Sequence, residues 1–252
     1  MAKRPRRPSK RVAIVAISGG VALLVVGFLL IYFVVFPTSS PKPFTLTTST
    51  STSAAGAAAG ATTTATQATS AGELAGHWKL VSGSEAGYRV REKLAFLPAE
   101  SDAVGRTSQI TGAATFSQNA GTVTISTASF DVAVGTLTSD RSQRDEKIHE
   151  IGLESSRYPT ATFVLSTPLR VSASALQGKV AHVSVTGIFN IHGTSRKETL
   201  PVEMSLSGST FQAVGSLTFP WSEFAMSAPS IGGFVNVSET ATMEFDLHLH
   251  HG

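Results

Sequence analysis

The chain has 252 residues, no cysteine, 20 Lys plus Arg, 17 Asp plus Glu and a formal net charge of +3. The lack of cysteine excludes disulfides, thiol nucleophiles and thiolate metal sites. Six basic residues lie within positions 1–11, whereas positions 77–252 hold 13 basic and 16 acidic residues, a net charge of −3. A basic nucleic-acid-binding face is therefore not predicted for the C-terminal part, and positions 1–11 form a separate basic N-terminus.

The first long apolar stretch, 12–36, contains no charged residue and consists mostly of Val, Ile, Leu and Phe. Roughly 20 such residues cross a bilayer, so the stretch predicts a transmembrane helix. A signal peptide is the alternative, but its apolar core is usually only about 7–15 residues long and precedes a small-residue cleavage site. The basic residues before the stretch favour a cytoplasmic N-terminus. We therefore expect a single-pass protein of the cell membrane with an extracytoplasmic C-terminal domain.

Residues 37–76 differ in composition from both neighbours, because Ser, Thr, Ala and Gly dominate them. Such a segment has too little large apolar surface to offset the entropy that ordering would cost. It is predicted to be a disordered linker between the membrane helix and a folded domain at 77–252.

Throughout 77–252, apolar and polar residues alternate with the period of two that half-buried β-strands show. The clearest runs are 181–191, 200–206, 210–219 and 240–249. In 122–134 the apolar positions change from odd to even, and a bulge near Ser126 and Thr127 would restore one inward face. About eight strands with one apolar face each cannot bury those faces as an open sheet. The pattern predicts an all-β domain, either a closed antiparallel barrel or two packed sheets.

A charge-dense stretch at 137–165 interrupts this alternation. Asp140 and Arg144 are four residues apart, and so are Arg141 and Asp145. This spacing of opposite charges supports a helix. Gly152 stands where a C-cap is expected, and 157–159 indicates a rigid turn. The stretch predicts one short amphipathic helix inserted between two strands.

Sequence patterns of common catalytic sites are absent from the chain. It has no G-x-S-x-G nucleophile elbow, no Gly-rich phosphate loop, no H-E-x-x-H motif and no EF-hand loop. We therefore predict no catalytic residues, no metal site and no enzyme activity.

Five separated segments carry motifs that occur together in one family. They are Ser139–Asp145 (S-D-x-x-x-R-D), Tyr158–Phe163 (Y-P-x-A-x-F), Val185–Arg196 (like V-T-G-x-L-T-I-x-G-V-T-R), Trp78–Glu92 and Val104–Thr107. Taken in chain order, these motifs resemble those of the YceI-like family of bacterial extracytoplasmic proteins, over roughly 77–249. One departure is Phe189-Asn190, where the family usually has Leu-Thr, and we expect it to change the shape of the interior.

The resemblance implies a lipocalin-like antiparallel β-barrel that binds long isoprenoid chains, such as polyprenyl lipids or the tails of isoprenoid quinones. The function predicted is therefore that of an extracytoplasmic, membrane-tethered binding protein for an apolar lipid, with no other cofactor and no nucleic-acid partner. The alternative is a structural or adhesive surface domain whose barrel is filled by its own side chains.

Inward parity and the resemblance together predict the residues that contact the ligand. They are Tyr88, Val90, Phe96, Phe130, Val132, Phe163, Leu165, Val185, Phe189, Phe211, Leu217, Phe219, Met243 and Phe245. Glu92 also has inward parity, and because a lone buried carboxylate is costly it needs a partner, for which the resemblance suggests Arg106. Asp140, Arg144 and Asp145 are expected to fix the helix to the barrel rim, or else to contact a ligand head group.

Overall fold

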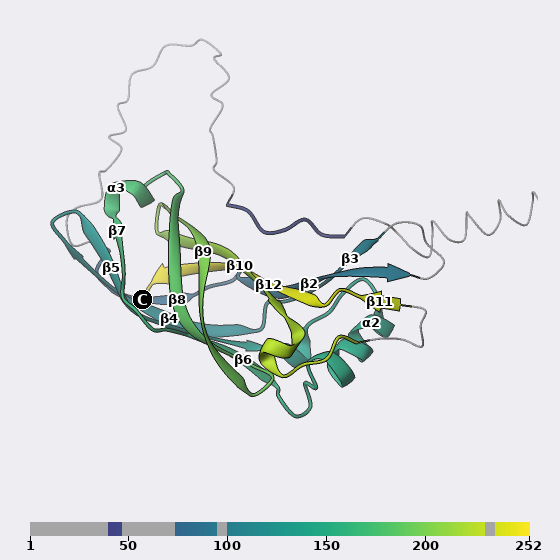
Figure 1. Cartoon of the computed structure of the whole chain (residues 1–252). Helices are drawn as coiled ribbons and strands as arrows, with labels where there is room; N and C mark the ends of the chain where they lie inside the picture. Colours follow the sequence, from purple (N-terminus) through teal and green to yellow (C-terminus); the bar gives the residue numbers. More distant parts are fainter. Residues whose placement is uncertain (1–39, 47–73, 95–99, 230–234) are drawn as a thin grey trace, which may run out of the picture. The chain divides into compact units, whose positions relative to one another are not determined.

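The chain divides into two compact units, 1–40 and 41–252. The structure is a computed structural model that describes residues 40–46, 74–94, 100–229 and 235–252. All the helices and strands below belong to the second unit (Figure 1).

The predicted transmembrane helix at 12–36 lies outside the described residues, as do most of the predicted linker and Phe96. In the part of the chain that is described, no helix has both the length and the apolar character that a membrane crossing needs. The prediction for 12–36 therefore stays a prediction.

Antiparallel strands make up most of the second unit. The described strands are β1 (Gly76–Leu80), β2 (Glu85–Leu94), β3 (Ser101–Thr107), β4 (Ile110–Asn119), β5 (Thr122–Ala133), β6 (Thr160–Leu165), β7 (Leu169–Ser172), β8 (Ala181–Ile191), β9 (Thr194–Ser207), β10 (Thr210–Pro220), β11 (Val235–Val237) and β12 (Thr240–His251). The helical segments are the 3₁₀ turns η1 (Val134–Thr136) and η3 (Trp221–Phe224), the α-helices α2 (Ser142–Lys147) and α3 (Ala173–Leu176), and the π-helical turn η2 (Ile148–Gly152).

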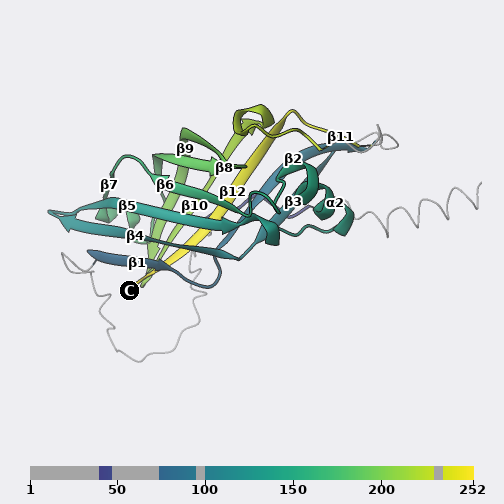
Figure 2. The ribbon, with the colours of Figure 1, turned by 90° about the horizontal axis from the view of Figure 1, so that it is seen from below.

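Eight of these strands close a barrel in the order β1–β4–β5–β6–β8–β9–β10–β12, and β12 pairs with β1 to complete the ring. Figure 2 shows β1, β4 and β5 side by side in this wall. Thr242–Asp246 of β12 pair with β2 instead, and β3 and β11 extend the sheet beyond β2. The predicted all-β antiparallel barrel is confirmed, as is the short helix inserted between two of its strands.

The predicted bulge in β5 is also confirmed. Thr115 faces Thr127 across the strand pair, whereas the next residue, Phe116, faces Ile125. Ser126 is therefore the extra residue, and its Oγ donates a hydrogen bond to the carbonyl of Thr115 at 3.1 Å. Because of this insertion, the inward positions of β5 change from odd to even numbers and its apolar side stays on the interior.

One end of the barrel is filled by its own aromatic side chains. The ring of Trp78 stacks on Phe116 with centroids 5.1 Å apart, and Phe211 meets Phe116 edge-on at 5.0 Å. The indole N–H of Trp78 donates to the carbonyl of Leu74 at 3.0 Å, and Leu74 is itself buried. The folded core therefore begins before residue 77, inside the segment predicted to be linker.

A buried carboxylate lies on the opposite side of the sheet from the interior. Glu244 alternates with Met243 and Phe245, which line the interior, and it is only 3% exposed. Its carboxylate is held by Arg106 Nη2 at 2.8 Å and by Arg89 Nε at 3.2 Å. Two guanidinium groups thus replace the water that this carboxylate loses on burial.

Residues 41–46 cover these two arginines (dark purple in Figure 1). The carbonyl of Pro41 accepts a hydrogen bond from Arg89 Nη2 at 2.7 Å, and that of Lys42 accepts one from Arg106 Nη2 at 2.6 Å. The guanidinium of Arg106 lies 3.7 Å from the centroid of the Phe44 ring. This short part of the predicted linker is therefore bound to the barrel.

Candidate functional site

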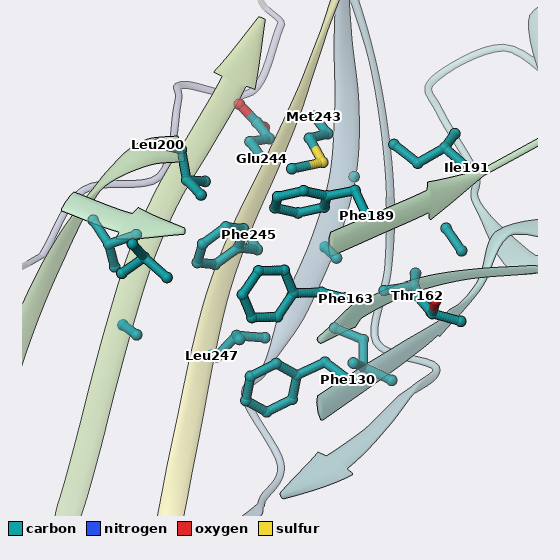
Figure 3. A pocket seen from close by; sticks show the side chains of 18 of the residues that line it. Phe130, Thr162, Phe163, Phe189, Ile191, Leu200, Met243, Glu244, Phe245 and Leu247 are labelled. Carbon is teal, nitrogen blue, oxygen red and sulfur yellow. The ribbon is translucent and has the colours of Figure 1, made fainter. Parts of the chain in front are cut away.

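An apolar cavity occupies the interior of the barrel and extends from the end that holds Phe116 and Phe211 to η2 and η3. Figure 3 shows part of its lining. Its volume is about 200 Å³, counted as the space open to the centre of a water molecule. One water needs roughly 10–15 Å³ on this measure, so the cavity is much larger than a packing defect. Among the described residues that line it, Glu244 alone is charged, and its carboxylate is bound by the arginines outside.

Most of the predicted ligand-contacting residues line this cavity. They are Tyr88, Phe130, Val132, Phe163, Leu165, Val185, Phe189, Phe211, Phe219, Met243 and Phe245. Val90 is buried and lines a neighbouring pocket, and Leu217 packs against the core without bordering the cavity. Phe96 lies outside the described residues.

Four aromatic rings of the wall lie where a glycine on the neighbouring strand leaves room for them. A Cβ atom on Gly215 would lie 2.6 Å from Cζ of Phe245, closer than real atoms approach, and the other three pairs are at least as tight. Each ring is therefore seated over the neighbouring backbone, against the wall of the barrel. The pairs are Tyr88 with Gly105, Phe130 with Gly112, Phe163 with Gly187, and Phe245 with Gly215.

These rings also contact one another around the cavity. Phe163 packs against Phe189 with centroids 4.8 Å apart, and it stacks with Phe130 at 6.3 Å. Figure 3 shows these three rings and Phe245 bordering the same space. The phenylalanine that departs from the family motif, Phe189, thus adds an aromatic surface to the wall.

Sequence reasoning missed part of the wall. Leu200, Val202 and Met204 of β9 line the cavity. The alternation of apolar and polar residues over 200–206 indicated that these three side chains point inward. Trp221 lines it too, but it comes from η3, where no strand periodicity applies. The indole N–H of Trp221 donates to the carbonyl of Ser238 at 2.8 Å, which fixes the ring at the edge of the cavity.

The predicted pairing of Glu92 with Arg106 is wrong. Glu92 is buried as expected, but its Oε1 lies 2.6 Å from Nη2 of Arg144, whereas Arg106 binds Glu244. The reason is geometric: Arg106 lies on the outer face with Glu244, while Glu92 has inward parity and faces α2. Arg144 also pairs with Asp140, and its pair with Glu92 joins α2 to β2.

The start of α2 is held by Asp145 in a way that sequence spacing did not show. Its Oδ1 accepts hydrogen bonds from the backbone N–H of Ser139 at 2.9 Å and from Ser139 Oγ at 2.6 Å. At the other end α2 stops at Lys147 and the chain continues as the π-helical turn η2, which ends at Gly152, so the C-cap is Leu153, one residue beyond the predicted position. Ile148 of that turn is buried against the core, while Ile151 is 41% exposed.

A second, more polar pocket of about 120 Å³ lies under α2. Its charged lining residues are Glu92, Arg141, Arg144 and Lys147. Tyr88 lines both this pocket and the apolar cavity. The phenol ring is therefore at the junction of the two spaces.

The two ionisable groups nearest this junction keep their usual protonation. Burial raises the pKa of the Tyr88 phenol, and the positive charge of Arg144 offsets this only in part. Burial alone would lower the pKa of Arg144, but the hydrogen bonds and negative charges of Glu92 and Asp140 together outweigh that effect and raise it. Tyr88 is therefore a hydrogen-bond donor, and Arg144 a cation, at neutral pH.

Nothing in this arrangement supplies a metal centre. In the described ranges, no cluster of three or more His, Asp or Glu side chains is placed to hold a metal ion. The chemistry that the site supports is burial of apolar surface in the cavity, with charged groups lining the pocket under α2.

The comparison with protein families matches the YceI-like domain to residues 78–249. This chain belongs to the YceI-like family. The match spans the barrel from β1 to β12 and confirms the resemblance that the sequence motifs indicated. No curated protein matches the chain.

Two solved structures have the same fold. A polyisoprenoid binding domain from Saccharophagus degradans, implicated in plant cell wall breakdown, covers 71% of this chain and 99% of its own, with 14% identity and a TM-score of 0.53. The YceI protein of Campylobacter jejuni covers 64% of this chain and 91% of its own, with 12% identity and a TM-score of 0.50. At these identities the likeness shows the fold alone.

Arg144→Met tests whether the helix is fixed by the Glu92 pair. The change leaves Glu92 buried without its cation, so we expect the free energy of unfolding to fall by about 2–3 kcal/mol. Urea unfolding measures it. The control is Lys147→Met, which removes the exposed pair between α2 and Glu150 and should leave the free energy of unfolding close to that of the parent. Equal stability of Arg144→Met and the parent would contradict an anchoring role.

Proposed function

We propose that this YceI-like protein is a membrane-tethered, extracytoplasmic binding protein that holds the chain of an isoprenoid or other long apolar lipid inside its barrel. The observation that carries the proposal is an interior kept open and apolar by aromatic rings seated over glycines. Such a lumen removes a lipid chain from water, which contributes about 0.8 kcal/mol for each buried CH₂ group. A polyprenyl lipid or the tail of an isoprenoid quinone fits this chemistry.

The Saccharophagus degradans domain named above is described as binding polyisoprenoid. That property belongs to the relative, and it supports the same ligand class here because both chains share the barrel. The apolar lining, in which Glu244, the one charged residue among those described, is paired with two arginines, points to the same class independently.

A structural or adhesive domain with a self-filled barrel is the competing proposal. The cluster of Trp78, Phe116 and Phe211 does fill one end in this manner. The rest of the interior argues against a self-filled barrel, because rings such as Phe163 and Phe245 lie against the wall and leave a cavity. Lipid binding is therefore the function that the geometry favours.

Tethering rests on the sequence of the first unit. The uncharged stretch 12–36, with the basic residues of 1–11 before it, supports a single membrane crossing with a cytoplasmic N-terminus. The barrel would then act outside the cytoplasm.

Replacement of Phe163 by Asp tests lipid binding inside the barrel. Asp at this position places a charge in the apolar cavity, and we expect the affinity for geranylgeraniol to fall at least about tenfold. Fluorescence of Trp221, which borders the cavity, reports the titration. The matched control is Val164→Asp, because Val164 is the next residue of β6 and is 46% exposed.

Val164→Asp should bind as the parent does. Circular dichroism confirms that both variants are folded at the temperature used. Parent-like binding by a folded Phe163→Asp variant would show that the lipid does not lie in the cavity. An equal loss of affinity for geranylgeraniol in both variants would contradict binding inside the barrel.

Topology is tested by protease treatment of intact host cells. We expect release of a folded fragment that begins between Pro37 and Gly76, because this segment would be exposed outside the membrane. Recovery of the fragment only after cell lysis would contradict the proposed orientation.

A further inference from the structure

The junction between the apolar cavity and the pocket under α2 contains hydrogen-bond donors that no described residue satisfies. The hydroxyl of Tyr88 and the Nε of Arg144 are both buried, and neither makes a hydrogen bond to a described residue. Buried donors without partners each cost about 1–3 kcal/mol, so their presence at one place needs a reason. Both residues line the polar pocket, and Tyr88 also lines the apolar cavity.

The hydroxyl of Ser139 does not serve as the partner of Tyr88. Ser139 Oγ lies close enough to affect the phenol, but it is already engaged by other groups. It donates to Asp145 at 2.6 Å and accepts from the N–H of Arg141 at 3.2 Å and from Arg144 Nη1 at 3.3 Å. The phenol is thus a donor that none of the described residues satisfies.

We propose that the polar pocket under α2 receives the head group of the lipid, and that Tyr88 donates a hydrogen bond to a neutral oxygen acceptor on that head group. This inference rests on the proposed function, because it assigns a place to the polar end of a chain held in the cavity. A lipid whose chain fills the cavity would bring its first polar atom to the junction, where the phenol stands.

The charges around the pocket select a neutral head group over an anionic one. Each of the three described cations that line the pocket has a carboxylate partner: Arg144 pairs with Glu92 and Asp140, Arg141 with Asp140, and Lys147 with Glu150. An incoming phosphate would therefore compete with these carboxylates for the cations, and it would approach buried Glu92. A carbonyl, ether or hydroxyl oxygen gains the phenol hydrogen bond without that repulsion.

The test uses the full-length protein and three probes that share a tetraprenyl chain. They are the methyl ether of geranylgeraniol, whose oxygen accepts but does not donate, the corresponding hydrocarbon, and geranylgeranyl monophosphate. Affinities are measured by tryptophan fluorescence for the parent and for Tyr88→Phe, which removes only the hydroxyl. Tyr158→Phe is the matched control, because Tyr158 lines neither pocket and its ring packs on His192 at 4.3 Å.

We expect the parent to bind the ether about tenfold more tightly than the hydrocarbon, and Tyr88→Phe to bind the two probes with similar affinities, because the phenol hydrogen bond to the ether oxygen is lost. Tyr158→Phe should behave as the parent. The thermal midpoint of ligand-free Tyr88→Phe should equal or exceed that of the parent, since the removed hydroxyl had no partner.

Other outcomes would overturn the inference. If Tyr88→Phe keeps the preference for the ether, or lowers the affinities for the ether and the hydrocarbon by the same factor, Tyr88 does not bind the head group. If the parent prefers the monophosphate, the head group is anionic. If the parent binds no probe, the proposed function fails as well, which separates that result from the others.

Discussion

The cavity of this barrel depends on where its aromatic rings are seated. An eight-stranded barrel is just wide enough for its own side chains to fill, or for one small ligand. Here a glycine opposite or diagonal to each of four rings lets the ring lie over backbone, as Gly187 does for Phe163 and Gly215 for Phe245. Any larger residue at those glycines would push the ring toward the lumen. The volume available to a ligand is therefore set by residues that never contact it.

Two buried carboxylates beside the lumen are each paired with arginine side chains at its margins. Glu244 is turned to the outer face and held by Arg89 and Arg106, and Glu92 is held by Arg144 from α2. Each pair replaces the hydration that its carboxylate loses. The lining of the cavity is mostly apolar, and charged side chains line the separate pocket beside α2. That separation of apolar chain space from polar end space matches the two parts of a prenyl lipid.

Much of the fold could be predicted because strand period is a local signal. Alternation placed Phe163 and Phe245 inward, and the change of parity near Ser126 revealed the bulge. Pairing between distant charges could not be predicted in the same way, since Glu92 and Arg144 are 52 residues apart and Arg106 fits either carboxylate by charge alone. The role of Gly187 was equally hidden, because it depends on the register of β6 with β8.

Native mass spectrometry of the protein purified from its own host tests the central claim most directly. The parent should carry the added mass of an isoprenoid or similar lipid. The double variant Gly187→Ala/Gly215→Ala should be folded but largely lipid-free, because the rings of Phe163 and Phe245 would enter the lumen. Equal lipid occupancy in the parent and the folded double variant would contradict the account, as would a parent that carries no lipid.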